Sequence, residues 1–196
     1  MNKLAYGVGF NDRKYPAYIS KKHVKEYGFW LGMLERCYSP LFLSKWPTYI
    51  GCEASNNFKN YSYFYEWCQE QVGFDAEGWH LDKDLLYRGN KIYGEDTCVF
   101  VPPELNTLLL TGKIKKVLDS DGFLLPVGVV WHSSQHNYHA SMKVDNKKVH
   151  LGVFKKWEDA FKCYKENKER HVKLKAEEWK HLVDVRVYNA LINYKV

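Results

Sequence analysis

The sequence predicts an α+β fold, with helices and short strands first, then a three-stranded antiparallel sheet with one covering helix and a C-terminal helix. Two observations carry this prediction. Apolar residues recur at the spacing of a helical stripe in residues 24–38 and 60–71. Apolar and polar side chains alternate with the period of a strand in residues 138–153. A helix predicted over about 157–175 is long enough to cover the apolar face of that sheet.

Composition describes a globular protein with a basic surface. The chain has 196 residues, of which 45% are hydrophobic, enough to bury one sizeable core or two small ones. Its net charge of +6 favours a polyanionic partner, because Lys and Arg side chains that bind phosphates release counterions. Aromatic residues make up 16% of the chain, and such residues serve cores first and stacking surfaces second.

Cysteine usage and hydropathy limit the class of protein further. The five cysteines form no C-x-x-C pair and no Cys/His spacing typical of zinc sites, so we interpret them as reduced core thiols. No apolar run approaches the roughly 20 residues needed to cross a bilayer, so no membrane partner is expected. The first ten residues hold too short an apolar region for a secretory signal, which predicts a cytoplasmic location.

The elements of the N-terminal part are predicted as follows. Residues up to about 22 hold glycines and a proline, which suits an extended arm or an irregular strand. A helix over 24–38 follows, and Trp30 and Leu34 lie on its apolar stripe. Two prolines mark residues 39–52 as a loop, and a second helix is predicted over 60–71.

Residues 78–106 place ionisable side chains inside a strand pattern. Alternation predicts two faces for the strand that begins near residue 80. One face carries His80, Asp82 and Asp84, and the other carries Leu81, Lys83 and Leu85. A loop with Arg88, Gly89 and Asn90 follows, in which Arg88 is a candidate DNA contact, and then a short strand over 97–101.

A helix is predicted to begin at Pro103, because proline is favoured in the first turn of a helix. Strand, loop, strand and helix form a compact unit, in which a carboxylate of the first strand and a polar side chain of the helix can share a divalent cation.

Simpler interpretations stay open for each of these residues. Asp82 and Asp84 can solvate the edge of a strand, and Asn90 after Gly89 is what a tight turn holds. Asn106 can cap the helix or face water, and His80 can pack beside Trp79.

The C-terminal part is predicted to begin near Pro126, after a boundary rich in turn residues and charge over 111–126. A strand over 129–131 comes first, and Asp145 and Asn146 form a tight hairpin turn between the next two strands. On the second strand Tyr138, Ala140, Met142 and Val144 face one way and His139, Ser141 and Lys143 the other. On the third strand Val149, Leu151 and Val153 alternate with Lys148, His150 and Gly152.

The face of this sheet that no helix covers is the predicted DNA-binding surface. Between residues 147 and 175 ten Lys or Arg stand against four Asp or Glu, a local net charge of +6. Lys can contact phosphate or guanine, Ser and neutral His can hydrogen-bond base edges, and Trp can pack on sugars or base methyls. A solvated basic face is the simpler alternative. The candidate residues are His132, His139, Ser141, Lys143, Lys148 and His150, with Trp131, Lys147 and Lys155 near the rim.

The first unit resembles the ββα-metal, or HNH, endonucleases of phages and other mobile elements. The resemblance lies in the order of an Asp, a basic residue, a Gly-Asn loop and the run CVFVPPELN at 98–106. It implies that Asp82 and Asn106 bind one Mg²⁺ or Mn²⁺ ion, that Asn90 steadies the loop, and that Lys83 occupies the place of the general base. The family has His there, and a protonated Lys cannot accept a proton. The base would then be His80 or a hydroxide on the metal, or else Lys83 with a pKa strongly lowered by burial or by the metal.

The second unit is similar to the ethylene-response, or APETALA-type, DNA-binding domain of plants, which also occurs in phage and bacterial homing endonucleases. The matching runs are GVVW, YHASMKV, KVHLGVF and the helix near WEDAFKCYK. That family lays a three-stranded sheet in the major groove and reads bases from the open face. The family uses several Arg residues for guanine, and this face has none.

Taken together, these resemblances imply an HNH-like nuclease domain over 1–115, a DNA-binding domain over 124–175 and a C-terminal helix over 176–196. The predicted activity is nicking or cleavage of double-stranded DNA, in the host cytoplasm if a phage encodes the chain. The alternatives are a catalytically inactive DNA-binding regulator or counter-defence protein, and a module that binds a host enzyme. The C-terminal helix is expected to pack on its own chain, with a homodimer contact as the second interpretation.

Overall fold

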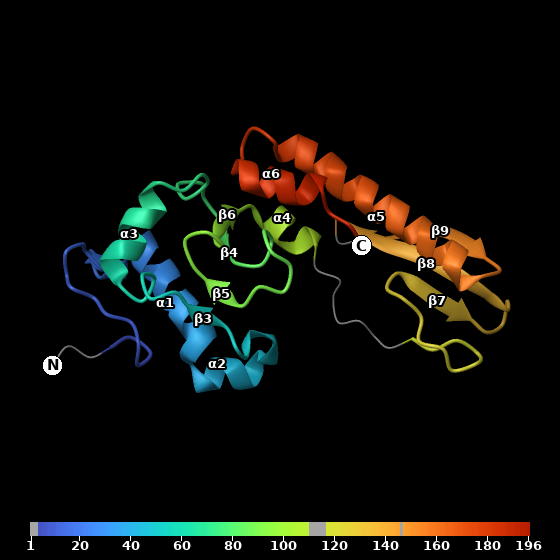
Figure 1. The fold of residues 1–196 in the computed structure, drawn as a ribbon, viewed down its shortest axis with the longest axis horizontal. Helices are drawn as coiled ribbons and strands as arrows, with labels where there is room; N and C mark the ends of the chain where they lie inside the picture. The colour runs from blue at the N-terminus through green and yellow to red at the C-terminus, as the bar shows by residue number, and fades with distance from the viewer. Residues whose placement is uncertain (1–3, 110–116, 146) are drawn as a thin grey trace. The chain divides into compact units, whose positions relative to one another are not determined.

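The chain folds as a mixed α+β protein (Figure 1). The computed structural model describes residues 4–109, 117–145 and 147–196. These fall into two compact units. The N-terminal unit comprises residues up to Asn106 together with Lys180–Ala190, and the C-terminal unit comprises Thr107–Trp179 and Leu191–Val196.

Both helices predicted in the N-terminal unit are present. Helix α1 spans Lys25–Tyr38 and buries Trp30 and Leu34, as the apolar stripe predicts. Helix α3 spans Tyr61–Gln69. Asn60 caps this helix, because its side-chain oxygen accepts hydrogen bonds from the backbone N–H groups of Ser62 at 2.8 Å and Tyr63 at 3.2 Å.

An aromatic core joins these helices to the strands. Trp30, Phe58 and Tyr61 are fully buried, and the rings of Phe58 and Phe64 meet edge to face at 5.1 Å. The indole of Trp30 donates to the carbonyl of Phe58 at 2.8 Å, so burial leaves its N–H satisfied. High aromatic content therefore serves the core of this unit.

The first segment forms a two-stranded hairpin, β1 (Tyr18–Ile19) and β2 (Lys22–His23), which agrees with the extended arm predicted there. The loop predicted over 39–52 is wrong. Helix α2 spans Pro40–Lys45 and a 3₁₀ turn, η1, spans Pro47–Tyr49. Each proline occupies the first position of its helix, where its missing N–H costs no hydrogen bond.

The segment with ionisable residues forms short strands and one helix. Strand β4 (His80–Asp82) pairs antiparallel with β6 (Val99–Val101), and helix α4 (Pro103–Leu108) follows. Strand β5 (Ile92–Tyr93) lies between them in sequence and pairs in parallel with β3 (Glu53–Ala54). The predicted order of strand, loop, strand and helix is thus present, with β5 as an addition.

The C-terminal unit contains the predicted three-stranded antiparallel sheet. Its order is β7 (Val129–His132), β8 (Asn137–Val144) and β9 (Lys147–Phe154). Helix α5 (Trp157–Trp179) packs on one face, and Val129, Ala140 and Ala160 are buried between the layers. This confirms the prediction that a helix covers one face of the sheet and leaves the other face open.

Two details of the predicted faces are wrong. A β-bulge between Ala140 and Ser141 interrupts the pairing of β8 with β9, so strict alternation along β9 fails. Val153 lies opposite His139 on the open face and is 49% exposed. Trp131, predicted near the rim of the DNA-binding face, instead packs against Tyr138 at 4.8 Å and belongs to the covered face.

The end of the chain differs from prediction in its boundaries. Helix α5 continues to Trp179, and the closing helix α6 spans only Val185–Ile192. Val187 and Leu191 are buried, whereas Leu182 and Val185 are exposed. The homodimer contact stays a prediction. Part of the predicted boundary at 111–126, and Asn146 of the predicted turn, lie outside the described residues.

The cysteines behave as the sequence predicts. All five are free thiols, and four are buried, with Cys163 partly so. Burial raises the pKa of the Cys37 and Cys98 thiols to about 12, which keeps them protonated and unreactive. Within the described residues, no helix combines the length and apolar character that a bilayer crossing requires.

A substitution at Gly128 tests how closely helix α5 packs on the sheet. Its φ is +84°, and a Cβ there would lie 2.1 Å from Cδ2 of Tyr164. Left-handed backbone and overpacking each destabilise. We expect Gly128→Ala to lower the free energy of unfolding by about 2 to 5 kcal/mol in denaturant titrations. The control Gly122→Ala, with φ of +77° and no neighbour within 4 Å, should lower it by about 1 to 2 kcal/mol. Equal losses would contradict the packing argument.

Candidate functional site

Strand β4 separates its side chains as the alternation predicts. Leu81, Lys83 and Leu85 are 7%, 7% and 8% exposed, so they face the interior. His80 and Asp82 project from the opposite face, with His80 exposed and Asp82 half-buried. The strand therefore presents an imidazole and a carboxylate on one face.

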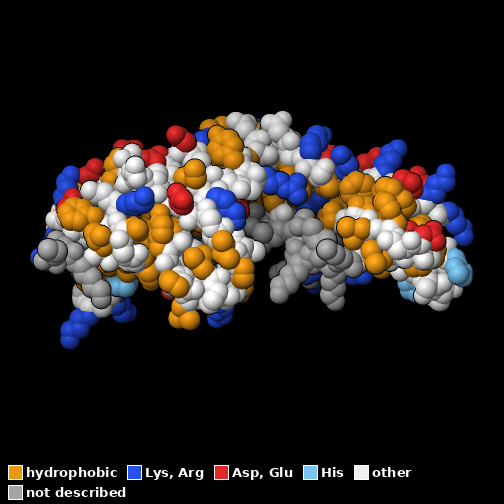
Figure 2. Space-filling view, turned by 60° about the horizontal axis from the view of Figure 1, so that its bottom comes forward, with side chains coloured by type: hydrophobic (Ala, Val, Ile, Leu, Met, Phe, Trp, Pro, Cys, Tyr) orange, Lys and Arg blue, Asp and Glu red, His pale blue; other side chains and the backbone are white. Residues whose placement is uncertain are grey.

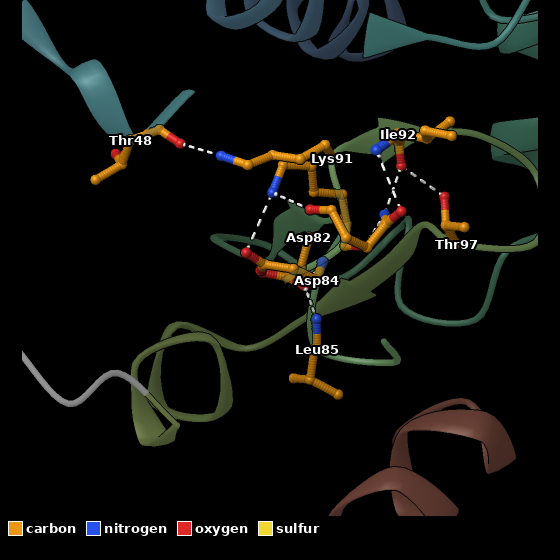
Figure 3. Close-up of polar contacts among 9 residues, drawn as sticks. Thr48, Asp82, Asp84, Leu85, Lys91, Ile92 and Thr97 are labelled. Atoms are coloured by element: carbon orange, nitrogen blue, oxygen red, sulfur yellow. Dashed lines mark hydrogen bonds and ion pairs between the residues drawn. The ribbon is translucent and has the colours of Figure 1, made fainter. Parts of the chain in front are cut away.

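The carboxylate of Asp82 is fixed by the backbone that follows it. Its Oδ1 accepts hydrogen bonds from the N–H groups of Asp84 at 2.9 Å and Leu85 at 2.6 Å (Figure 3). Burial, and then the neighbouring charge of Asp84, raise the pKa of Asp82. An ionised Asp82 is thus held in an environment that disfavours its charge, and a nearby cation would relieve this.

Helix α4 brings a third side chain to this face. Asn106 Nδ2 lies 3.1 Å from His80 Nδ1, across 26 residues of sequence. As oriented, the amide donates to Nδ1, which places the proton of a neutral imidazole on Nε2. Rotating the amide by 180° would present its oxygen to Nδ1–H and leave Nε2 free to accept a proton.

Asp82 and Asn106 are suitable ligands for a hard divalent cation. Oδ1 of Asp82 takes both backbone hydrogen bonds, so Oδ2 is the oxygen that can face an ion. The amide oxygen of Asn106 is the second such ligand. Mg²⁺ commonly binds through one or two protein oxygens and keeps several waters. Across residues 4–109, 117–145 and 147–196, no group of three or more His, Cys, Asp or Glu side chains suits a metal ion.

Lys83 does not share this face. Its ammonium is buried and donates to Asp84 Oδ2 at 3.1 Å and to the carbonyl of Asn90 at 3.0 Å. It also lies 5.9 Å and 5.8 Å from the ring centroids of Tyr49 and Tyr93. Through these contacts the Lys83 ammonium holds the loop between residues 83 and 90 and acts as a brace, a role that does not include accepting a proton.

Asn90 completes the brace. Its Nδ2 donates to the carbonyls of Lys83 at 2.6 Å and Ile92 at 2.7 Å, and its Oδ1 accepts from the N–H of Ile92 at 3.2 Å. Lys91 reaches across to the carbonyl of Thr48 (Figure 3). The loop-steadying place that the resemblance implies for Asn90 agrees with these bonds, which also describe a well-made turn.

The aromatic partners of Lys83 were missed by sequence reasoning. Tyr49 lies 34 residues before Lys83, in the segment predicted to be a loop, so no local pattern points to it. Arg88, a predicted DNA contact, is exposed in the loop that Lys83 and Asn90 hold.

The open sheet face of the C-terminal unit carries a row of histidine rings. His132 and His139 stack at 4.8 Å, and His139 and His150 approach at 5.4 Å. Burial, and then His132, His150 and Lys148, lower the pKa of His139, which favours its neutral form. Ser141 lies opposite His150 on the same face.

Like charges face one another at the end of this sheet. Lys143 of β8 pairs directly with Lys148 of β9, and both are exposed. Like charges opposite each other across strands are destabilising, and a bound anion would relieve this. Lys147 and Lys155 are exposed nearby in sequence. Figure 2 shows histidine and basic side chains close together on this unit.

Comparison with models of protein families, with curated proteins and with solved structures finds no match for this chain. The site is therefore interpreted from its own geometry.

The environment assigned to Asp82 can be tested by measuring the free energy of unfolding. Its folded pKa is raised, so it stabilises the fold at pH below its unfolded pKa, and this contribution is lost as pH rises through the folded value. At pH 7 without metal, Asp82→Asn should raise the free energy of unfolding by about 0.5 to 2 kcal/mol, since the amide oxygen can still accept both backbone hydrogen bonds. The gain should shrink as pH falls.

The control for this measurement is Asp84→Asn. It removes the ion pair of the buried Lys83 and should lower the free energy of unfolding. Thermal unfolding in chelator at several pH values checks both variants. Loss of stability in Asp82→Asn at pH 7 would contradict the assigned environment.

Proposed function

We propose that the chain is a DNA-binding, HNH-like endonuclease that nicks or cleaves double-stranded DNA with one divalent cation. The observation that carries the proposal is the contact of Asn106 with His80, two residues from Asp82 on the same strand face. This contact supports a pair of metal ligands, Asp82 and Asn106, beside a proton acceptor, His80.

Asp82 and Asn106 would hold the cation, Mg²⁺ or Mn²⁺. When bound, such an ion supplies positive charge that stabilises the oxyanions formed as a phosphodiester is cleaved. Asp82 keeps its orientation through the N–H groups of Asp84 and Leu85, so the ligand is pre-organised.

His80 is the proposed general base. Histidine is suited to proton transfer near neutral pH, and His80 is exposed on the face that Asp82 shares. With its Nδ1–H donated to the Asn106 oxygen, Nε2 would take the proton of the attacking water. Asn106 in this role is a positioning residue as well as a ligand.

The open sheet of the C-terminal unit is the proposed DNA-binding surface. Lys143 and Lys148, held opposite each other, would each contact phosphate, and the histidine row would face base edges. A polyanionic partner would relieve the repulsion between these two lysines.

One observation favours a second candidate, a catalytically inactive DNA-binding regulator or counter-defence protein. The residue directly after Asp82 is a buried, hydrogen-bonded Lys, so the place where the HNH family has its base is occupied by a structural side chain. If His80 does not act as the base, the site would bind a cation without cleaving DNA.

Cleavage and metal binding are tested separately. Supercoiled plasmid incubated with the protein and Mg²⁺ or Mn²⁺ should be nicked, and His80→Ala should reduce the rate by about 100-fold or more, the usual contribution of a general base. Metal alone should raise the melting temperature of the wild type and of His80→Ala, since it binds only the folded state. Asp82→Asn should lose both effects.

Asp96→Asn, an exposed carboxylate in the same unit, is the matched control and should behave as wild type. Metal-dependent stabilisation with no nicking would support the inactive regulator. The absence of both effects would refute the metal site.

Substitution of Lys143 and Lys148 tests DNA binding by the open sheet face. The double variant Lys143→Gln/Lys148→Gln should reduce the slope of log affinity against log salt by about 2, because two phosphate contacts are lost. Its free energy of unfolding should be unchanged or higher, since repulsion is removed. Lys162→Gln/Lys173→Gln, two exposed residues of α5, removes the same charge away from the sheet and should leave the slope near that of wild type. Equal slopes for both variants would exclude the sheet face.

A further inference from the structure

An uncharged strip of three side chains, Val130, His139 and Val153, crosses the middle of the open sheet face. Val130 of β7 and Val153 of β9 lie directly opposite His139 of β8, on either side of it. The two valines are 38% and 49% exposed, on a face whose other side chains are polar or charged. An isopropyl group therefore stands on each side of one imidazole.

The hydrogen bonds of His139 define what this imidazole can recognise. Its Nε2 lies 2.8 Å from Asn137 Oδ1 and 3.1 Å from Gln135 Oε1, both acceptors, so Nε2 carries the proton. Nδ1 of the neutral ring is then a hydrogen-bond acceptor. The lowered pKa of His139 keeps the ring in this form at neutral pH.

A methyl-binding surface beside a hydrogen-bond acceptor matches one base pair in the major groove. An A·T pair presents the adenine N6 amino group as donor and the thymine C5 methyl group as apolar contact. A G·C pair offers a donor on cytosine N4 but no methyl group. Guanine is most often read by Arg, and residues 117–145 and 147–169 contain no Arg.

We infer that the strip of Val130, His139 and Val153 reads A·T base pairs in the major groove, with valine against the thymine methyl group and His139 Nδ1 accepting from adenine N6. The inference rests on the proposed DNA binding by this sheet and adds its base preference. The Lys pair at the end of the sheet would set affinity through phosphate, and the strip would set discrimination.

The ordinary explanation for exposed valine is its preference for strands. That explanation predicts no response to the chemistry of the DNA. Threonine is also β-branched and favours strands, but it replaces one methyl group by a hydroxyl. The pair of substitutions Val130→Thr and Val153→Thr therefore keeps the strand preference and weakens the apolar contact.

The experiment compares two pools of short duplexes with the same randomised sequences, one with thymine and one with uracil in its place. Uracil keeps every hydrogen-bonding group of thymine and lacks only the methyl group. The full chain should bind the uracil pool about fourfold more weakly for each methyl group buried. Val130→Thr/Val153→Thr should bind both pools more nearly equally, with its melting temperature near that of wild type.

The outcomes separate this inference from the proposed function. Equal binding of both pools by the wild type, with affinity still dependent on Lys143 and Lys148, would overturn the base preference and leave DNA binding intact. Unchanged discrimination in the double Thr variant would also overturn it, because the methyl group would be read elsewhere. Failure to bind either pool would refute DNA binding and the base preference together.

Discussion

The candidate site depends on the ion pair and the hydrogen bonds of the buried Lys83 ammonium. It donates to Asp84 and to the carbonyl of Asn90, while Asn90 donates back to the carbonyl of Lys83. A buried charge is tolerated only when it is paired, so removing the carboxylate of Asp84 would leave the ammonium without its counter-charge. Since the chain turns directly after Asp82, this reciprocal brace holds the backbone N–H groups that orient the Asp82 carboxylate.

The same physical constraint recurs in both units: side chains of like charge lie near one another, where a counter-charge would lower the electrostatic cost. Asp82 is raised in pKa by burial and by Asp84, and Lys143 faces Lys148 across two strands. Each arrangement lowers the stability of the isolated chain, and each is relieved by a counter-charge, a cation in the first case and a phosphate in the second. Both arrangements support the proposed function, which needs a cation in the N-terminal unit and a polyanion at the open sheet.

Features that depend on a regular period were predicted from the sequence, and features that depend on contacts distant in sequence were not. The stripe that contains Trp30 specifies α1, and the alternation from Tyr138 to Val144 specifies the faces of β8. The bulge beside Ala140 changed the face of Val153, because one extra residue reverses the alternation beyond it. Of the site, alternation predicted the interior direction of Lys83 and the shared face of His80 and Asp82. The contact between His80 and Asn106 spans 26 residues, so no local period predicts it, although the order of strand, loop, strand and helix predicts one compact unit.

Strand geometry also bears on which residue can serve as the proposed general base. Lys83, directly after Asp82, is buried on the interior side of the chain, where Asp84 and the carbonyl of Asn90 hold its ammonium. On strand β4 a residue two positions before Asp82 points to the same face as Asp82, and His80 stands there. The amide of Asn106 on helix α4 contacts His80. With Lys83 engaged as a brace, His80 is the side chain on the face of Asp82 that suits the proposed general base, and its contact with the amide of Asn106 can set its tautomer.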